Sequence, residues 1–251
     1  MDIQFGYFLK SIMKKKIKHI IIFLFALTSY SQNNISILYK LKIFDEEGIF
    51  KNNQNLRDAF LNTINSVDKT EFKLIIAGNN AKFYKDKNAS NTSEGFVNGF
   101  SGFTGNVYYK KDSIYSKIEI LGNNIFLKTF KKENWNLEKE SKMIDNFLCY
   151  KATNLNKVIG LKDKIWNHPV VAWYCPELPF AFGPNGYGNL PGLILELQVR
   201  NVSFTMSKID FDSKDTFEID ILKRSKLLSE SESNIIFKEK YEIEKSKFEK
   251  K

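Results

Sequence analysis

Apolar and polar residues alternate along much of the chain after residue 34, and this pattern predicts a protein built mainly of β-strands. The first strand is expected over 35–43, where Ile35, Ile37 and Tyr39 alternate with polar or charged neighbours. Further strands are expected at 70–77, 81–85, 103–110, 113–121, 124–131, 147–152, 171–174, 193–200, 202–206 and 217–221. Turn residues separate many of these segments, so the strands are expected to pair as antiparallel hairpins.

Two segments have helical spacing instead. Leu56, Phe60 and Ile64 predict an amphipathic helix near 55–67, with Asn55 as its N-cap. Residues 229–251 are highly charged and predict a surface helix with a frayed end, whereas 86–102 is expected to be a loop. The fold class is therefore α+β and mainly β, with one antiparallel, strongly curved sheet. A half-barrel, a closed barrel and a sandwich all satisfy this pattern.

The N-terminal region has the pattern of an export signal. A basic stretch, Lys14–Lys18, precedes eight apolar residues, Ile20–Leu27, and Ser29 and Ser31 are the small residues of a cleavage site. Met13, just before the lysines, is the expected start. The apolar run is too short for a membrane-spanning helix, which needs about 20 such residues.

This signal sets the expected organisation of the chain. Residues 1–31 comprise an upstream extension and a signal peptide that is removed, 32–228 form a single β-rich domain, and 229–251 form a helical tail. The mature protein is expected in the periplasm, associated with the outer membrane, or secreted. It is not expected to span a membrane.

Composition excludes several kinds of function. Without residues 1–31 the formal net charge falls from +9 to +5, and this surplus comes from scattered lysines, with only Arg57, Arg200 and Arg224 as arginines, so nucleic-acid binding is not expected. His168 is the one histidine beyond the export signal, which leaves no multi-histidine metal site and no assigned catalytic residue. We expect no metal and no cofactor. The acidic group Asp210, Asp212 and Asp215 lacks the glycine and distal glutamate of a calcium loop and is interpreted as a solvated hairpin end.

Two cysteines, Cys149 and Cys175, lie in the mature sequence. An exported protein meets an oxidising compartment, where such a pair can form a disulfide. The alternative is two buried free thiols.

The segment 173–192 combines aromatic residues with proline and glycine. Pro184 is expected at the first central position of a turn, followed by Asn185 and Gly186 at positive φ, which would leave Tyr187 displayed on a stiff loop. A rigid aromatic loop is typical of a binding surface, and equally of the cover of a core. The candidate binding residues are Trp173, Tyr174, Pro179, Phe182, Gly183, Pro184, Gly186, Tyr187, Pro191 and Gly192.

The run from Trp173 to Ile194, which contains Leu190-Pro191-Gly192-Leu193-Ile194, resembles the signature of the GLPGLI family of exported proteins from Gram-negative bacteria. Cys149-Tyr150-Lys151-Ala152 is similar to a second element of that family. Asn189 stands where the hexapeptide begins with glycine, and asparagine is the residue that best replaces glycine at positive φ. The resemblance implies export and a β-rich fold, but no activity, cofactor or catalytic residue.

These observations favour a non-enzymatic binding module of unknown function for an apolar or extended ligand or a protein partner of the cell envelope. One alternative is a hydrolase that uses two carboxylates, such as Glu177 with Glu196. Another is a structural accessory subunit of an envelope complex.

Overall fold

The computed structural model describes residues 33–86, 94–118, 125–130, 134–159 and 165–249. The predicted export signal, residues 1–31, lies outside the described residues.

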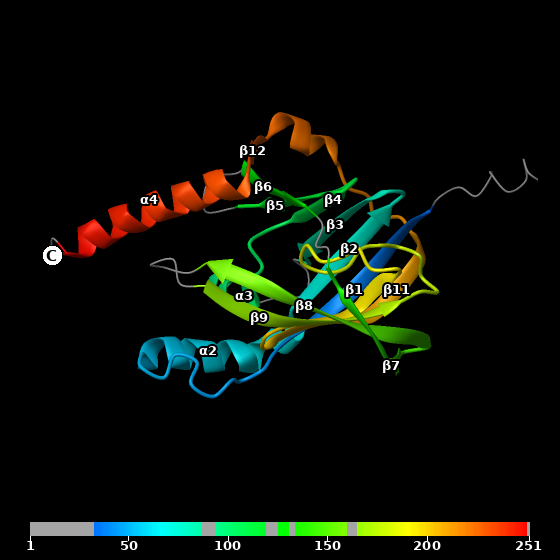
Figure 1. The fold of residues 1–251 in the computed structure, drawn as a ribbon, viewed down its shortest axis with the longest axis horizontal. Coiled ribbons are helices and arrows are strands. Elements are labelled where there is room, and N and C mark those ends of the chain that lie inside the picture. Colours follow the sequence, from blue (N-terminus) through cyan, green and yellow to red (C-terminus); the bar gives the residue numbers. More distant parts are fainter. Residues whose placement is uncertain (1–32, 87–93, 119–124, 131–133, 160–164, 250–251) are drawn as a thin grey trace, which may run out of the picture. The chain divides into compact units, whose positions relative to one another are not determined.

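Twelve strands of the described chain form one curved sheet (Figure 1). Their order across the sheet is β12-β6-β5-β4-β3-β2-β1-β11-β10-β9-β8-β7. The strands are β1 (Asn34–Ile43), β2 (Glu71–Ala77), β3 (Asn80–Lys85), β4 (Val107–Lys110), β5 (Ser113–Lys117), β6 (Ile125–Phe130), β7 (Asn136–Ile144), β8 (Phe147–Ile159), β9 (Ile165–Cys175), β10 (Leu193–Val199), β11 (Val202–Ser213) and β12 (Lys226–Leu228).

The strand order consists of two meanders that meet where β1 pairs with β11. One runs from β1 to β6, and the other returns from β7 to β11. All neighbouring pairs are antiparallel except β12 and β6, which are parallel, so the sheet is mixed. The predicted β-rich class and curved sheet are therefore confirmed, and the sheet remains unclosed.

The connection between the two meanders explains the curvature. Phe130 ends β6 and Asn136 begins β7, yet these strands lie near opposite ends of the strand order. The chain from Phe130 to Asn136 can span at most roughly 20 Å, because an extended chain advances about 3.3–3.6 Å per residue. The sheet must therefore curl until its two ends come near each other. We call the open gap between the β6 side and the β7–β8 side the seam.

Three α-helices and two short 3₁₀ segments accompany the sheet in the described chain. They are α2 (Gln54–Ser66), η1 (Val67–Lys69), α3 (Glu94–Ser101), η5 (Asp220–Arg224) and α4 (Glu230–Glu249). The helices predicted near 55–67 and at the C-terminus are thus present. The N-cap of α2 is Asn53 rather than Asn55, because the Asn53 side chain accepts a hydrogen bond from the Leu56 amide.

Two predicted elements were wrong. The described part of the expected loop 86–102 includes the helix α3, whose Val97 is buried and whose Phe100 packs edge-on against Phe60 of α2. Its glycines lower helix propensity and made it resemble a loop. The strand expected at 217–221 is instead irregular chain that leads into η5, because this segment packs on the outer face of the sheet and pairs with no strand.

The concave face of the sheet holds the main core. Phe72 and Phe83 stack with ring centroids 5.3 Å apart, and Phe204 meets both rings edge-on. The chain between β9 and β10 packs into this same core through its own side chains, Leu178, Phe182, Tyr187 and Leu190. The interior of the curved sheet is thus filled by the protein's own loop.

Candidate functional site in the seam of the sheet

The loop between β9 and β10 is held by a tight turn at Asn185-Gly186. The Tyr187 amide donates to the Pro184 carbonyl over 3.0 Å, while Asn185 and Gly186 have φ values of +50° and +83°. Positive φ at both central positions is characteristic of a type I′ turn, which favours Asn-Gly. The predicted positive φ values are confirmed, but Pro184 precedes the central pair instead of opening it. Asn189 also has positive φ, at +63°.

The buried Tyr109 of β4 holds this turn in place with two hydrogen bonds. The Tyr109 hydroxyl donates to the Gly183 carbonyl and accepts from the Gly186 amide over 2.8 Å. Burial raises the pKa of Tyr109 far above its usual value, so the hydroxyl keeps its proton. The turn is thereby tied to the strand beneath it.

Most candidate aromatic residues are part of the core instead of a display surface. Tyr187 is only 6% exposed and packs edge-on against Trp135, so the expectation that it is displayed was wrong. Phe182 is buried against Tyr109, and Tyr174 is buried beside Tyr150. The Tyr187 ring lies in the interior because the loop that carries it packs into the concave face of the sheet.

The remaining candidates are divided between interior and surface. The Lys142 ammonium lies over the Trp173 ring, 4.3 Å from the ring centroid. Gly183, Pro184 and Gly192 are buried, Gly186 is half-buried, and Pro179 and Pro191 are exposed. Gly183 has no room for a side chain, because an added Cβ would lie 2.7 Å from the Ile194 Cβ. The ten candidates therefore do not form one surface.

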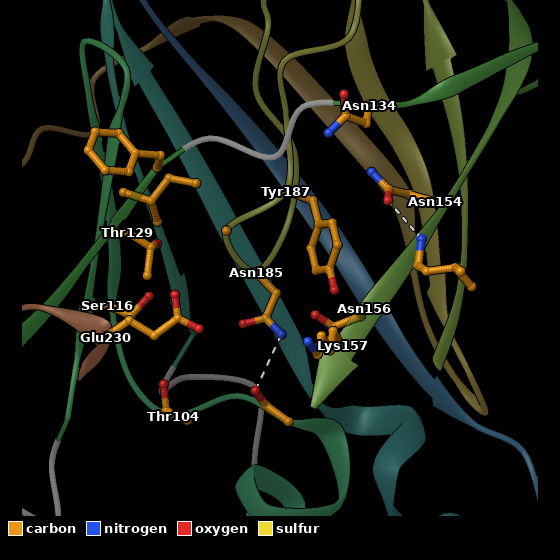
Figure 2. A pocket seen from close by; sticks show the side chains of 15 residues that line it. Thr104, Ser116, Thr129, Asn134, Asn154, Asn156, Lys157, Asn185, Tyr187 and Glu230 are labelled. Atoms are coloured by element: carbon orange, nitrogen blue, oxygen red, sulfur yellow. Dashed lines mark hydrogen bonds between the residues drawn. The ribbon is translucent and has the colours of Figure 1, made fainter. Parts of the chain in front are cut away.

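A groove of about 630 Å³ lies in the seam and brings together segments far apart in the sequence. We call it the seam groove. It is lined by Gly102, Thr104, Ile114, Ser116, Thr129, Phe130, Asn134, Asn154, Leu155, Asn156, Lys157, Asn185, Gly186, Tyr187 and Glu230. Figure 2 shows Ser116, Thr129 and Glu230 along one side, Asn134 and Asn154 along the other, and Asn185 between them. Only Asn185, Gly186 and Tyr187 connect the groove to the loop singled out by sequence.

The groove is polar because inward-facing positions near the seam carry polar side chains, whereas those further from the seam carry apolar ones. On β8, Ala152 is buried in the core, whereas Asn154 and Asn156, at the next positions on the same face, line the groove. On β5 the change is from Ile114 to Ser116. Sequence reasoning missed these residues. Their signal was the replacement of apolar residues by polar ones at inward positions near strand ends.

The pairing of β7 with β8 ends close to the groove. Among the described residues, the last pair of β7 with β8 in this direction is Asn136 with Thr153. The Leu155 amide there donates to the Asn154 Oδ1 over 2.7 Å. On the opposite side, the Asn185 Nδ2 donates to the Gly102 carbonyl over 3.4 Å.

The charges in the groove balance. Lys157 is its one cationic residue and Glu230 its one acidic residue among the described lining. Amides and hydroxyls supply the other polar groups, and such groups both donate and accept hydrogen bonds. This arrangement suits an uncharged polar ligand better than a strongly charged one.

The carboxylates considered for hydrolysis are not in the groove. Glu196 is bound to the Lys142 ammonium over 2.8 Å, and Glu177 is exposed on the loop after β9. His168 lies opposite Asn156 on the β8–β9 ribbon, and its pKa is lowered mainly by desolvation and then by Arg200. Among the described residues no group of three or more His, Cys, Asp or Glu could hold a metal ion.

Cys149 and Cys175 are both buried and carry free thiols. Tyr150 pairs with Tyr174 across β8 and β9, so the two cysteines face each other one position further along. Burial, followed by the neighbouring Cys175, raises the pKa of the Cys149 thiol to about 12. This thiol is therefore protonated and weakly nucleophilic at neutral pH.

Fold and groove together describe a protein with one curved, unclosed β-sheet, its concave face filled by its own loop and its seam lined by polar side chains. No helix of the described chain is both long enough and apolar enough to cross a membrane.

Comparison with known proteins gives a short family match and some similar solved structures. A family model described as "Protein of unknown function (Porph_ging)" matches residues 161–196. No curated protein matches the chain. Two solved structures of PNGF-II are similar to it, with TM-scores of 0.48 and 0.45 and sequence identities of 14% and 13%. The matches cover 82% and 79% of this chain but only 33% and 31% of the PNGF-II chains.

Proposed function

We propose that this chain is an exported, non-enzymatic binding protein that takes an extended polar ligand in the seam groove. One observation carries the proposal: amide and hydroxyl side chains from separate parts of the sequence converge on a groove of about 630 Å³. That volume is within the roughly 300–1,000 Å³ typical of ligand sites. The apolar ligand considered from the sequence is less favoured, because Phe182 and Leu190 occupy the apolar interior themselves.

A binding role is favoured over hydrolysis by the groove's single carboxylate. Hydrolysis by paired carboxylates needs two acidic groups about 5–10 Å apart across the substrate. Glu230 is the one acid in the described lining, while Glu196 is held by Lys142. A catalytic pair is therefore not assembled from the acids that line this groove.

Export is supported by the basic and apolar pattern of Lys14–Leu27 and by the family resemblance. The segment 161–196, which matches the family of unknown function, contains the Leu190–Ile194 run that resembles the GLPGLI signature. We therefore propose that the mature protein begins near residue 32 and works in the periplasm, at the outer membrane or outside the cell.

Blocking the groove is expected to abolish ligand binding. The probes are a panel of neutral oligosaccharides and a panel of unstructured peptides, passed over the immobilised mature protein. Asn156→Trp places a bulky ring in the groove and is expected to weaken any binding at least tenfold, because the ring occupies the ligand's volume. The measurement is surface plasmon resonance.

Asn167→Trp is the matched control, because Asn167 is exposed on the same ribbon, faces away from Asn156 and does not line the groove. It should bind like the unmodified protein, and both variants should keep the same melting temperature. Failure of both panels to bind, or equal binding by Asn156→Trp and the unmodified protein, would exclude the seam groove as the site.

Intact mass of the protein recovered from the cell envelope tests export and cysteine pairing together. We expect the mass of a chain that lacks residues 1–31 and is lighter by the two thiol hydrogens of a Cys149–Cys175 disulfide. Because Cys149 has a raised pKa, closure is expected to need the cell's oxidant and to be slow in air. A retained leader would refute export, and two alkylated cysteines without reductant would refute the bond.

A further inference from the structure

The β8–β9 ribbon carries large exposed apolar side chains where its two strands approach their connecting turn. Leu155 and Val158 of β8 are 61% and 37% exposed. Ile165 and Trp166 of β9 are 52% and 47% exposed. We call residues 154–159 and 165–170 the ribbon end. Single exposed apolar residues are ordinary, but several gathered at one end of a ribbon indicate an interaction surface.

The exposed apolar side chains lie on both faces of the ribbon end. Val158 pairs with Trp166, so these two side chains share one face. Leu155 lies three positions before Val158, and Ile165 directly precedes Trp166, so both of these lie on the other face. A flat protein surface would cover only one face of the ribbon end. The apolar side chains therefore call for surroundings that enclose the ribbon end, as lipid encloses an inserted segment.

The charge of the ribbon end favours an anionic surface. Lys157 is exposed there, and residues 154–159 and 165–170 contain no aspartate or glutamate. A lysine can keep its ammonium among phosphate headgroups while its methylene groups contact apolar atoms. Trp166 suits the same place, because tryptophan is enriched at the boundary between water and hydrocarbon. Apolar faces, an exposed tryptophan and an unopposed lysine together match a bilayer that contains anionic phospholipid.

We propose that the ribbon end inserts into the surface of a bilayer containing anionic phospholipid, with Ile165 and Trp166 at the acyl boundary and Lys157 at the phosphates. This inference goes beyond the ligand proposed for the seam groove and does not depend on it. Insertion of this kind is shallow, about 5–10 Å, so backbone groups outside the β8–β9 pairing stay within reach of water. The ribbon end would hold the protein at a membrane surface without a segment that crosses the membrane.

The test uses residues 32–251, so that the apolar leader cannot contribute, and two kinds of vesicle. One contains phosphatidylethanolamine with phosphatidylglycerol, and the other contains phosphatidylcholine alone. Co-sedimentation is expected to be about tenfold stronger with the anionic vesicles and to weaken in about 0.5 M sodium chloride. Tryptophan emission should shift to shorter wavelength on binding, and Trp166→Phe should abolish this shift, because Trp135 and Trp173 are less exposed.

Ile165→Asn removes an inserted apolar side chain and is expected to weaken binding to the anionic vesicles about fivefold to tenfold. Phe211→Asn is the matched control. Phe211 is similarly exposed, at 50%, but lies on β11 outside the ribbon end, so its replacement should change the affinity by less than about twofold. Equal melting temperatures for the two variants exclude a difference caused by unfolding.

The emission shift separates insertion from loose attraction between scattered lysines and an anionic surface. Salt-sensitive binding with a Trp166 shift, weakened by Ile165→Asn and unchanged by Phe211→Asn, supports the inference. Binding without the shift, or equal affinity of Ile165→Asn and the unmodified protein, overturns insertion of the ribbon end. Absence of vesicle binding, or equal binding to both kinds of vesicle, overturns the anionic bilayer as its partner. None of these outcomes bears on ligand binding in the seam groove.

Discussion

Replacing Gly192 with alanine is expected to lower the free energy of unfolding by about 3 kcal/mol or more. A Cβ at this position would lie 2.1 Å from the Cys175 carbonyl oxygen and 2.9 Å from the Pro176 nitrogen. Both contacts are with backbone, which cannot rotate away as a side chain can. Gly192 also has a φ of +156°, where an L-residue is strained.

The surrounding structure limits relief of this clash. The Cys175 carbonyl accepts from the Leu178 amide, and the Leu193 amide, directly after Gly192, donates to the Leu178 carbonyl. Moving either segment therefore disturbs the start of β10 and the end of β9 together. Chemical denaturation, followed by circular dichroism, measures the loss, and incomplete folding of the variant would be the extreme form of the same result.

Gly99→Ala is the matched control. Gly99 lies in α3, and an added Cβ would meet no atom within 4 Å. Alanine favours helix over glycine by about 1 kcal/mol, so this variant should be as stable as the unmodified protein or slightly more stable. Equal stabilities for Gly192→Ala and Gly99→Ala would contradict the packing described around Gly192.

The second large effect is expected for Tyr109→Phe, which should lower the free energy of unfolding by about 2 kcal/mol. The change keeps the buried ring and removes only the hydroxyl. The Gly183 carbonyl loses a donor, and the Gly186 amide loses the acceptor it reaches over 2.8 Å. Polar groups left without partners in a buried place cost more than the net value of the bond itself.

Tyr115→Phe supplies the comparison, because Tyr115 lies half-buried on the neighbouring strand β5. Its loss of stability should stay within about 0.5 kcal/mol. Hydrogen exchange of the Gly186 amide gives a second readout, since this amide should exchange faster in Tyr109→Phe and unchanged in Tyr115→Phe. Matched stabilities and exchange rates for the two variants would show that the Tyr109 hydroxyl does not hold the turn.

Both variants test how the loop between β9 and β10 is held in place. Gly192 allows the end of the loop to press against β9, and Tyr109 ties its turn to β4. Between these points the loop fills the concave face and presents Asn185 to the groove. The unusual composition of 173–192 is thus explained by packing, and only a small part of it is left for a ligand.

Sequence reasoning located the candidate loop but misjudged which of its residues meet solvent. Tyr187 was expected to be displayed, because a turn with Pro184, Asn185 and Gly186 usually lies at a surface. The turn type depends on local residues and was predictable. The burial of the following ring depends on which strands surround it, and no local pattern contains that information.

The sequence by itself determined the local conformations: the alternation of β1, the helical spacing of α2 and the positive φ values at Asn185 and Gly186. These follow from interactions between residues close in the chain, which composition and spacing describe directly. Only the tertiary structure decided that β6 and β8 face each other across the seam and join Thr129 with Asn154 and Asn156 in one groove. That meeting results from the curl of the whole sheet, and each polar residue taken alone looks like an ordinary end of a strand.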